Sequence, residues 1–419
     1  MKELERRETP ASGGSKDEFY GMWSSIFGTT AVIGCPGSEA KGPDGEMHKL
    51  GRVHIFDGKE SDSKDGSDSK LAWEETIVLE PSTRATKFGL AASFGFRVAL
   101  SGDVLAVTAF IDGTRFRRVG MVYVFRRGSD TSSWLEEAII LPPQNAQDDN
   151  ALMATFGTQI AVSGDTVAIS SPKSHNGKGA VYVFSRRANV DGTVLWAEEA
   201  KLESSDGAEK DEFGSSLAIH GQTIVSGSVL AKSGNGKTIG KAYIFSKNAK
   251  EYWIEASILT SSDGRGNTDF GFSFAIYDGI VAIGAPFAGA SRDGAVYVYA
   301  CSGGGDNISC EERATLSADN ASEFGGSLAL HGSLLAIGAP STPTPTSSAE
   351  GEGGGAYVYK NNGGTWTLQN KFQYRDTMSL GRSIGISKTA LVAADPVYKR
   401  NGLEKSGAAF IANYLLTEC

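Results

Sequence analysis

The chain has 419 residues, 53 of them glycine and only 12 proline, and its formal net charge is −9 at pH 7. This acidic balance argues against nucleic acid or an anionic membrane surface as a partner of the whole chain. No apolar run reaches the roughly 18 residues that a membrane-spanning helix needs, so we expect no direct membrane insertion. The first residues, MKELERRETPASGG, are charged and lack the apolar stretch of a signal peptide.

One pattern occurs seven times along the chain. It opens with an aromatic residue or Leu, then Gly, then two short apolar runs, as in FGSSLAIHGQTIVSGS. The seven copies begin at Tyr20, Phe94, Phe156, Phe213, Phe270, Phe324 and Leu380. Such repeats pack on their neighbours rather than fold alone, so we treat residues 1–419 as a single domain.

Each copy predicts four short strands, named A to D in chain order. Strands A and B form the opening block and are joined by a tight turn such as SGD or HGQ. A Gly-led block such as GAVYVF supplies strand C, and in most copies a block such as WEETIVL supplies strand D. Alternating or continuous apolar runs with Gly-rich punctuation are typical of strands. The sequence therefore predicts an all-β fold, a seven-bladed β-propeller of four-stranded antiparallel blades.

Recurrent residue types suggest how the blades pack. We expect the opening Phe to wedge between neighbouring blades and its Gly to let the backbones pass closely. Strand A should line the axis and be buried on both faces. Strand D should carry partly exposed tryptophans over the outer edge, since five of the six share that register. They are Trp73, Trp134, Trp196, Trp253 and Trp366.

The seventh copy has strands A, B and C but no clear fourth block. The segment LERRETPASGGSKDEFYG resembles AKLESSDGAEKDEFG, the strand D tail of the third unit. We therefore expect residues around 1–9 to supply the outer strand of the last blade. The alternative is that residues 413–418 do so. Either closure removes exposed strand edges that would invite aggregation.

Motifs of the form FGSSLAI, LAIGAP and GAVYVF resemble those of FG-GAP repeat proteins, over about residues 16–412. The best-known members are integrin α-subunit propellers, and the likeness is closer to the short-turn variety of bacterial and algal surface proteins. The resemblance implies a propeller used for adhesion or ligand binding, often secreted or at the cell surface. Integrins carry a calcium loop in the A–B hairpin, whereas this chain has only SGD, HGQ, YDG or HGS there. We expect no metal site and no cofactor.

Four cysteines are present, without a CxxC pair: Cys35, Cys301, Cys310 and Cys419. Cys301 and Cys310 flank the Gly-rich turn SGGGDNIS, and Cys310 takes the strand D position that other units give to Trp. This spacing suits a disulfide across a hairpin, which would indicate an oxidising compartment. The alternative is two unpaired thiols.

Enzyme motifs are missing from the sequence. It has no GxSxG elbow, no HExxH and no Walker A loop, and its five histidines are scattered. We interpret His220 and His331, which share the A–B turn register, as turn residues. We expect no catalytic residues. The alternative is a propeller enzyme acting on glycans, a lyase or glycosidase, with paired carboxylates or an arginine cluster in an axial pocket.

The loops between strands hold the candidate ligand-binding residues. The B–C and D–A loops of a propeller emerge on one face, which usually binds. Here the B–C loops are basic and the D–A loops acidic, as in DGAEKDE. The candidate ligand-binding residues are Arg115, Phe116, Arg117, Arg118, His175, Arg292, Tyr398, Lys399 and Arg400. They would suit an acidic polysaccharide or a protein ligand, the alternative being ordinary solvated loop charge.

Together these patterns predict a non-catalytic ligand-binding or adhesion propeller, extracellular or at the cell surface. An intracellular protein-interaction scaffold is a further alternative, and it predicts free thiols. Two sequons, Asn307-Ile-Ser309 and Asn320-Ala-Ser322, fit a secreted glycoprotein.

Overall fold

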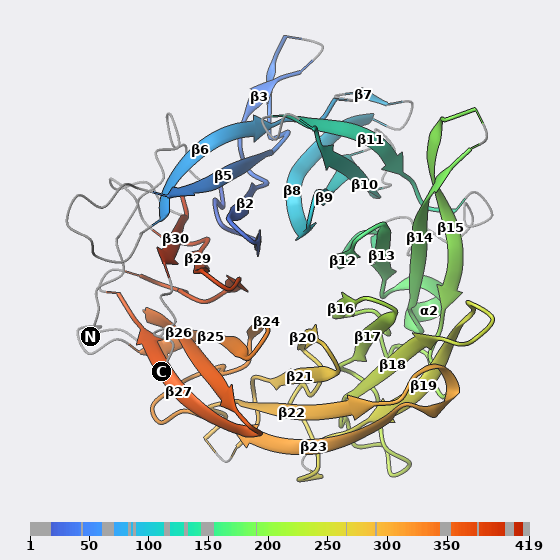
Figure 1. Ribbon diagram of the computed structural model, residues 1–419, viewed down its shortest axis with the longest axis vertical. Helices are drawn as coiled ribbons and strands as arrows, with labels where there is room; N and C mark the ends of the chain where they lie inside the picture. Colours follow the sequence, from blue (N-terminus) through green and yellow to red (C-terminus); the bar gives the residue numbers. More distant parts are fainter. Residues whose placement is uncertain are drawn as a thin grey trace.

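A computed structural model describes residues 18–42, 45–60, 71–82, 85–86, 89–112, 118–129, 133–143, 155–189, 191–264, 266–289, 291–343, 353–374, 377–398 and 406–413. Seven antiparallel sheets stand around one axis, and Figure 1 looks down that axis. The predicted seven-bladed β-propeller is confirmed. Short helical turns, α2 (Ser174–Gly177) and η2 (Gly305–Asn307), lie in loops.

Each blade runs outward from the axis in chain order. The innermost strands are β1 (Ser24–Phe27), β8 (Gly89–Ser101), β12 (Ile160–Ser163), β16 (Leu217–His220), β20 (Ser273–Tyr277), β24 (Ser327–His331) and β28 (Ser383–Ile386). The second strands are β2 (Thr30–Cys35), β9 (Val104–Asp112), β13 (Thr166–Ser171), β17 (Thr223–Ser228), β21 (Ile280–Ala285), β25 (Leu334–Pro343) and β29 (Ala390–Asp395).

The outer half of each blade holds the Gly-led and Trp-bearing strands. The third strands are β5 (Arg52–Glu60), β10 (Arg118–Arg127), β14 (Ala180–Ala188), β18 (Lys241–Lys247), β22 (Ala295–Ser302), β26 (Gly353–Asn362) and β30 (Ala408–Asn413). The outermost strands are β6 (Leu71–Leu79), β11 (Trp134–Ile140), β15 (Val194–Leu202), β19 (Trp253–Leu259), β23 (Ser309–Leu316) and β27 (Thr365–Phe372). In the described part of the chain, blade 7 shows three strands and blade 2 gains a short fifth, β7 (Ala85–Thr86).

Neighbouring blades are joined by the Phe-Gly block. The five opening phenylalanines are fully buried, and each ring lies near an aromatic ring of its own third strand, for example Phe213 and Tyr243 at 5.4 Å between centroids. The backbone of the same residue pairs with the first Gly of the preceding blade's third strand, and the Phe213 N–H donates to the carbonyl of Lys178 at 3.0 Å. One residue therefore joins two blades, as the sequence predicted.

Glycine is required on both sides of this joint. A Cβ placed on Gly179 would lie 2.0 Å from the carbonyl oxygen of Phe213, far inside contact distance. Gly214, directly after the Phe, has φ +91°, in the left-handed region that disfavours side chains. The same joint closes the ring, because Tyr20 pairs with Gly407.

Burial peaks in the second strands rather than in the first. Every residue of β2 is buried, and so are the last five of β17. The innermost strands are half-buried on average, because one edge faces the axial channel; β16, for example, has one buried residue in four. The expectation that strand A is buried on both faces is therefore corrected.

Two of the strand D tryptophans are more buried than expected, at 6% exposed for Trp73 and 8% for Trp134. Asn413 accepts a hydrogen bond from the Trp73 indole at 2.9 Å, and the Arg127 guanidinium lies over the Trp134 ring. The link from Trp73 to Asn413 crosses from blade 1 to blade 7. Asn413 ends β30, whereas the rest of both predicted closures, residues 1–9 and 414–418, lies outside the described residues.

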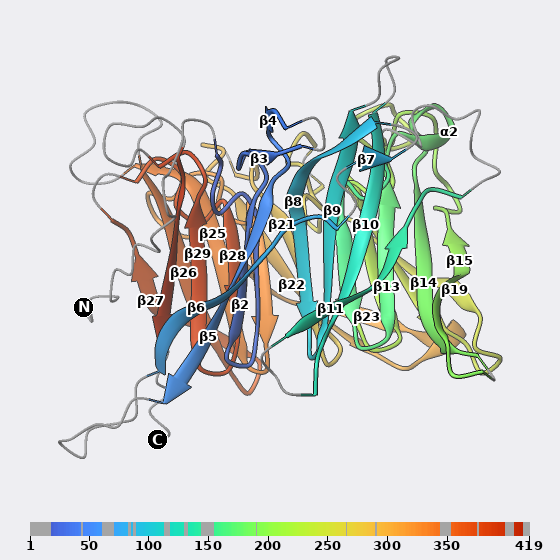
Figure 2. The same cartoon turned by 90° about the horizontal axis from the view of Figure 1, so that it is seen from above.

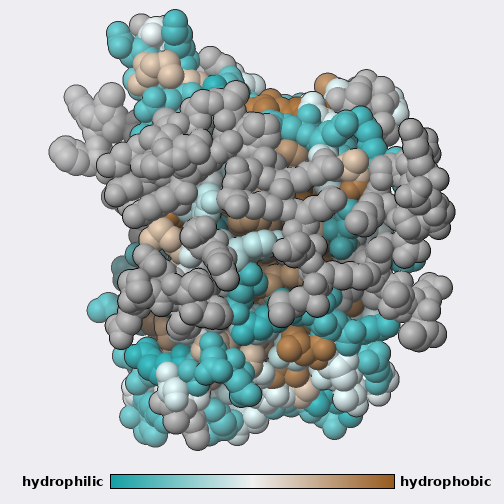
Figure 3. All heavy atoms as spheres, turned by 90° about the vertical axis from the view of Figure 1, so that its left-hand side faces the viewer, coloured by the Kyte–Doolittle hydropathy of each residue, from teal (hydrophilic) through white to brown (hydrophobic). Residues whose placement is uncertain are grey.

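The outer surface is mixed in character. Figure 3 shows the side of the ring near blades 6, 7 and 1, where separate hydrophobic patches lie between hydrophilic ones on the coloured part. The exposed apolar residues of the outermost strands include Val78 and Leu368. No helix of the described chain is long and apolar enough to cross a membrane.

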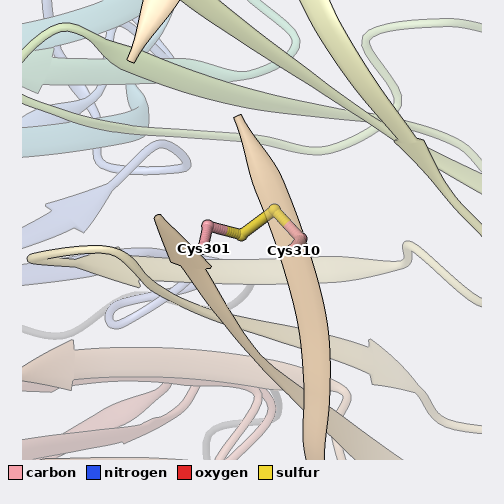
Figure 4. Close-up of a disulfide and its surroundings, with 2 residues drawn as sticks. All are labelled: Cys301 and Cys310. Atoms are coloured by element: carbon pink, nitrogen blue, oxygen red, sulfur yellow. A yellow bond between two sulfur atoms is a disulfide. The ribbon is translucent and has the colours of Figure 1, made fainter. Parts of the chain in front are cut away.

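The predicted disulfide is present. Cys301 on β22 and Cys310 on β23 are directly opposite each other, and their sulfurs are bonded, as Figure 4 shows. The bond closes the hairpin that contains η2, at a sequence separation of 9. Cys35 is buried, and burial raises the pKa of its thiol.

We predict that Gly179→Ala destabilises the protein by about 3 kcal/mol, because the new Cβ meets the Phe213 carbonyl and the backbone is strained. Gly192→Ala is the matched control, since Gly192 has a similar φ of +82° with nothing within 4 Å of its Cβ position. It should cost about 1 kcal/mol. Urea denaturation measures both, and equal losses would show that the inter-blade contact is unimportant.

We also predict that Cys301→Ser with Cys310→Ser lowers stability by about 2–3 kcal/mol, the value for a closed loop of this length. Thermal and urea unfolding without reductant provide the measurement. In the presence of reductant the variant and the parent protein should unfold alike. A difference that persists there would come from packing instead of the cross-link.

Candidate functional site

The connecting loops divide between two faces of the propeller. Loops between second and third strands, and between successive blades, emerge on one side, which we call the upper face. In Figure 2 this face carries α2, β7 and the small hairpin of β3 (Ala40–Lys41) and β4 (Met47–His48). The tight turns between first and second strands emerge on the opposite side, the lower face.

Of the candidate loop residues, three have described side chains. His175 is exposed in α2 with its Nε2 3.4 Å from Lys201 Nζ, and Arg292 is exposed with its guanidinium over Phe287. Tyr398 is only 7% exposed. Arg118 begins β10, without a described side chain, and Arg115, Phe116, Arg117, Lys399 and Arg400 lie outside the described residues.

An axial channel of ≈ 240 Å³ opens between these two faces. Three consecutive residues of every innermost strand line it, such as Val98–Leu100 and Ile384–Ile386. The middle residue of each triplet is small: Ser25, Ala99, Ala161, Ala218, Ala275, Ala329 or Gly385. Since only one edge of each innermost strand is paired, the other edge presents backbone N–H and C=O groups toward the axis.

A ring of seven residues stands where the channel meets the upper face. We call it the upper ring: Trp23, Arg97, Gln159, Ser216, Ser273, Ser327 and Ser383. Most of these side chains hydrogen-bond the opening segment of the next blade. Gln159 donates to the Ser215 carbonyl at 2.8 Å, and Ser327 donates to the Gly381 carbonyl at 2.7 Å. The upper ring therefore ties the innermost strands together around the mouth.

Blade 1 departs from this pattern. Trp23 replaces the small polar residue, and the guanidinium of Arg97 in blade 2 lies over its ring, 3.2 Å from the centroid. Arg97 also donates from Nε to the Thr158 carbonyl at 2.7 Å. Stacking on an aromatic ring suits the planar guanidinium far better than an ammonium. Trp23 therefore holds the Arg97 guanidinium at the channel mouth.

A second cation lies close by. Burial lowers the pKa of Arg97, and the positive charge of Arg382 lowers it further. Arg382 is exposed and stands one position before the upper ring in blade 7. Among the described residues no carboxylate forms an ion pair with either arginine. An anion bound between them would relieve this repulsion.

Sequence reasoning missed this site because it looked in the loops. A register comparison could have found it, since Trp23 and Arg97 stand where the other units have Ser or Gln. Residues that break a repeat pattern while keeping a charge buried are expected to mark functional positions. Elsewhere in the described chain, no group of three or more His, Cys, Asp or Glu side chains is placed to hold a metal.

The channel mouth combines hydrogen-bond donors with aromatic surface. Two guanidinium groups provide planar donors, and Trp23 with Phe96 supplies aromatic surface, the Arg97 guanidinium lying 5.9 Å from the Phe96 centroid. Phe272, 38% exposed, adds an aromatic residue in blade 5 at the register of Arg382. Carboxylate or sulfate groups next to a sugar ring or an aliphatic surface fit such a mouth.

Comparison with protein families gives one match. The family model described as FG-GAP repeat matches residues 134–184, 196–245 and 253–299. Each match runs from the outermost strand of one blade to the third strand of the next, and so contains the opening Phe-Gly pair of a blade.

No curated protein matches the chain. Among solved structures, Sqt1 of Saccharomyces cerevisiae is similar at 12% identity and a TM-score of 0.45, covering 95% of this chain and 86% of that one. A protein of Bacteroides fragilis proposed to be a 6-phosphogluconolactonase is similar at 12% identity and a TM-score of 0.49, covering 93% and 95%.

We predict that Arg382→Gln leaves the melting temperature unchanged or raises it, because it removes repulsion on Arg97. Arg52→Gln is the control, since Arg52 has an ion-pair partner, Glu80, at 3.0 Å. That control should lose a few tenths to about 1 kcal/mol. Differential scanning calorimetry at low salt compares them. A loss at Arg382 as large as at Arg52 would contradict the proposed repulsion.

Proposed function

We propose that this propeller, three segments of which match the FG-GAP repeat model, is a non-catalytic module that binds an acidic polysaccharide at its upper face. The observation that carries the proposal is the Arg97 guanidinium stacked on Trp23 beside Arg382, at the centre of that face. In a chain of net charge −9, two neighbouring arginines without described carboxylate partners are unusual. Retaining them at a cost in repulsion supports a role in binding.

The rest of the upper face fits a polyanion. His175 and Arg292 extend the basic surface outward from the mouth on loops of blades 3 and 5. Some of the acidic charge of the loops between blades is already neutralised, for example by Lys241, whose Nζ lies 2.6 Å from Asp206. Tyr243 donates to the same carboxylate at 2.7 Å. A polyanion crossing the face would therefore meet less repulsion than the sequence suggests.

The channel wall favours binding over catalysis. Glycosidases work with a pair of carboxylic acids at a fixed separation. The described residues that line the channel are aliphatic, aromatic, Ser or Gly, so they supply contact and backbone hydrogen bonds rather than acid–base groups. The glycan-active enzyme is the second candidate, favoured by the arginines alone.

The disulfide supports an extracellular or cell-surface setting for this binding. Disulfides form and persist in oxidising compartments and are rare in the cytosol. Cys301 and Cys310 are half-exposed at a hairpin, where a reducing environment could reach them. An intracellular scaffold would carry these two residues as thiols, which alkylation and mass determination on the native protein would detect.

We predict that the protein binds immobilised polygalacturonate and not neutral dextran, and that binding weakens as salt rises. Arg97→Gln combined with Arg382→Gln should lower the affinity at least tenfold, a loss of about 1.4 kcal/mol. Arg313→Gln, an exposed arginine on β23, is the matched control and should bind normally. Surface plasmon resonance measures all three.

Three results would overturn the proposal. Equal binding by the double variant and the Arg313→Gln control would place the site elsewhere. Release of shortened or unsaturated oligosaccharides by the parent protein would replace the binding module with an enzyme. Absence of polysaccharide binding, together with salt-dependent capture of an acidic protein that the double variant fails to capture, would identify a protein ligand instead.

A further inference from the structure

The lower end of the channel carries a second ring of residues. In each blade the residue after the lining triplet ends the innermost strand or its turn, and we call these seven the lower ring. They are Phe27, Ser101, Ser163, His220, Tyr277, His331 and Ser387. Four blades depart from serine: blade 1 has Phe27, and the adjacent blades 4, 5 and 6 have His220, Tyr277 and His331. Sequence analysis interpreted the two histidines as turn residues and gave them no further role.

The side chains of His220, Tyr277 and His331 form a ladder of rings. The His220 ring lies 4.7 Å from the Tyr277 ring, and Tyr277 lies 5.1 Å from His331, measured between centroids. The interplanar angles are 38° and 55°. All three side chains are half-buried, so each keeps part of its surface open to solvent at the mouth. Blades 4, 5 and 6 thus present two imidazoles and a phenol side by side.

The charges around this ladder are mostly cationic. Burial lowers the pKa of His331, followed by the effects of His220 and of Lys388, an exposed residue in the tight turn of blade 7. The innermost strands on either side of β24 are β20 and β28, which bring Tyr277 with Asp278 and Lys388 respectively. Asp278 directly follows Tyr277, yet the charged groups that shift the pKa of His331 are His220 and Lys388.

A bound anion would offset the effects of His220 and Lys388 on His331. We propose that the lower mouth binds an oxyanion, a sulfate or phosphate group held between His220, His331 and Lys388, with the Tyr277 hydroxyl donating to it. Imidazolium, ammonium and phenol are all hydrogen-bond donors to such a group. In the neighbouring blades 2 and 3 the lower ring has the small residues Ser101 and Ser163. The site lies on the face opposite the upper ring and is independent of the proposed function.

Histidine titration gives a direct test, because the chain has only five histidines. We would follow their imidazole resonances by ¹H–¹⁵N NMR against pH in sodium sulfate and in sodium chloride of equal ionic strength. A bound dianion favours the charged imidazolium, so the pKa of His331 should rise in sulfate by about one unit. Sulfate affinity should consequently increase as the pH falls. His54, whose Nδ1 lies 2.8 Å from Glu75, is the internal control and should not respond.

Variants assign the contacts and the source of the anion. Lys388→Gln should lower sulfate affinity severalfold, while Lys250→Gln, on the adjoining hairpin turn of blade 4, should not. Dextran sulfate and neutral dextran distinguish an esterified group from free sulfate. A response of His331 to either sulfate source supports the site and identifies that source. Identical His331 titrations in chloride, sulfate and dextran sulfate would overturn the proposal, whatever the upper face binds.

Discussion

The whole propeller depends on one close contact, the Phe carbonyl of one blade against the Gly of its neighbour. A side chain at Gly179 would place a carbon 2.0 Å from the Phe213 oxygen, and the same approach recurs at every junction, including Gly407 with Tyr20. Because the joint includes backbone pairing as well as ring packing, it sets both the spacing and the tilt of the blades. The joint therefore also positions the innermost strands and the upper and lower rings that they carry.

In this repeat protein, the candidate functional positions are those where a residue differs from the repeat pattern. Where the joint is regular, the upper ring is serine or glutamine and serves only to tie strands together. Trp23 and Arg97 break that series in the two blades that follow the ring closure, and His220, Tyr277 and His331 break the lower series in three others. The upper departure puts an arginine, and the lower departure two imidazoles, at the channel mouths of an acidic protein.

The sequence was sufficient for the fold and for the disulfide, because both follow from local register. The joint is recognisable in the sequence from Phe213, Gly214 and Gly179. Cys310, which takes the Trp position, indicates Cys301 as its partner across the hairpin. The site was less accessible to prediction. The meeting of Trp23 with Arg97 joins residues 74 positions apart through the geometry of neighbouring blades, which no window of sequence displays. Exposure was also predicted wrongly for Tyr398, which lies in a loop and is nevertheless only 7% exposed.

The fixed width of the axial channel has a consequence for how a polymer could approach. Close packing at all seven joints prevents the blades from spreading, so the bore keeps the ≈ 240 Å³ that the small middle residues leave. Water and small ions fit a space of that size, which is far smaller than a polysaccharide chain. A polysaccharide bound as proposed would lie across the channel opening, and its side groups would contact the upper face. Recognition of this kind is indifferent to chain ends, so internal segments of a long polymer would serve as well as its termini.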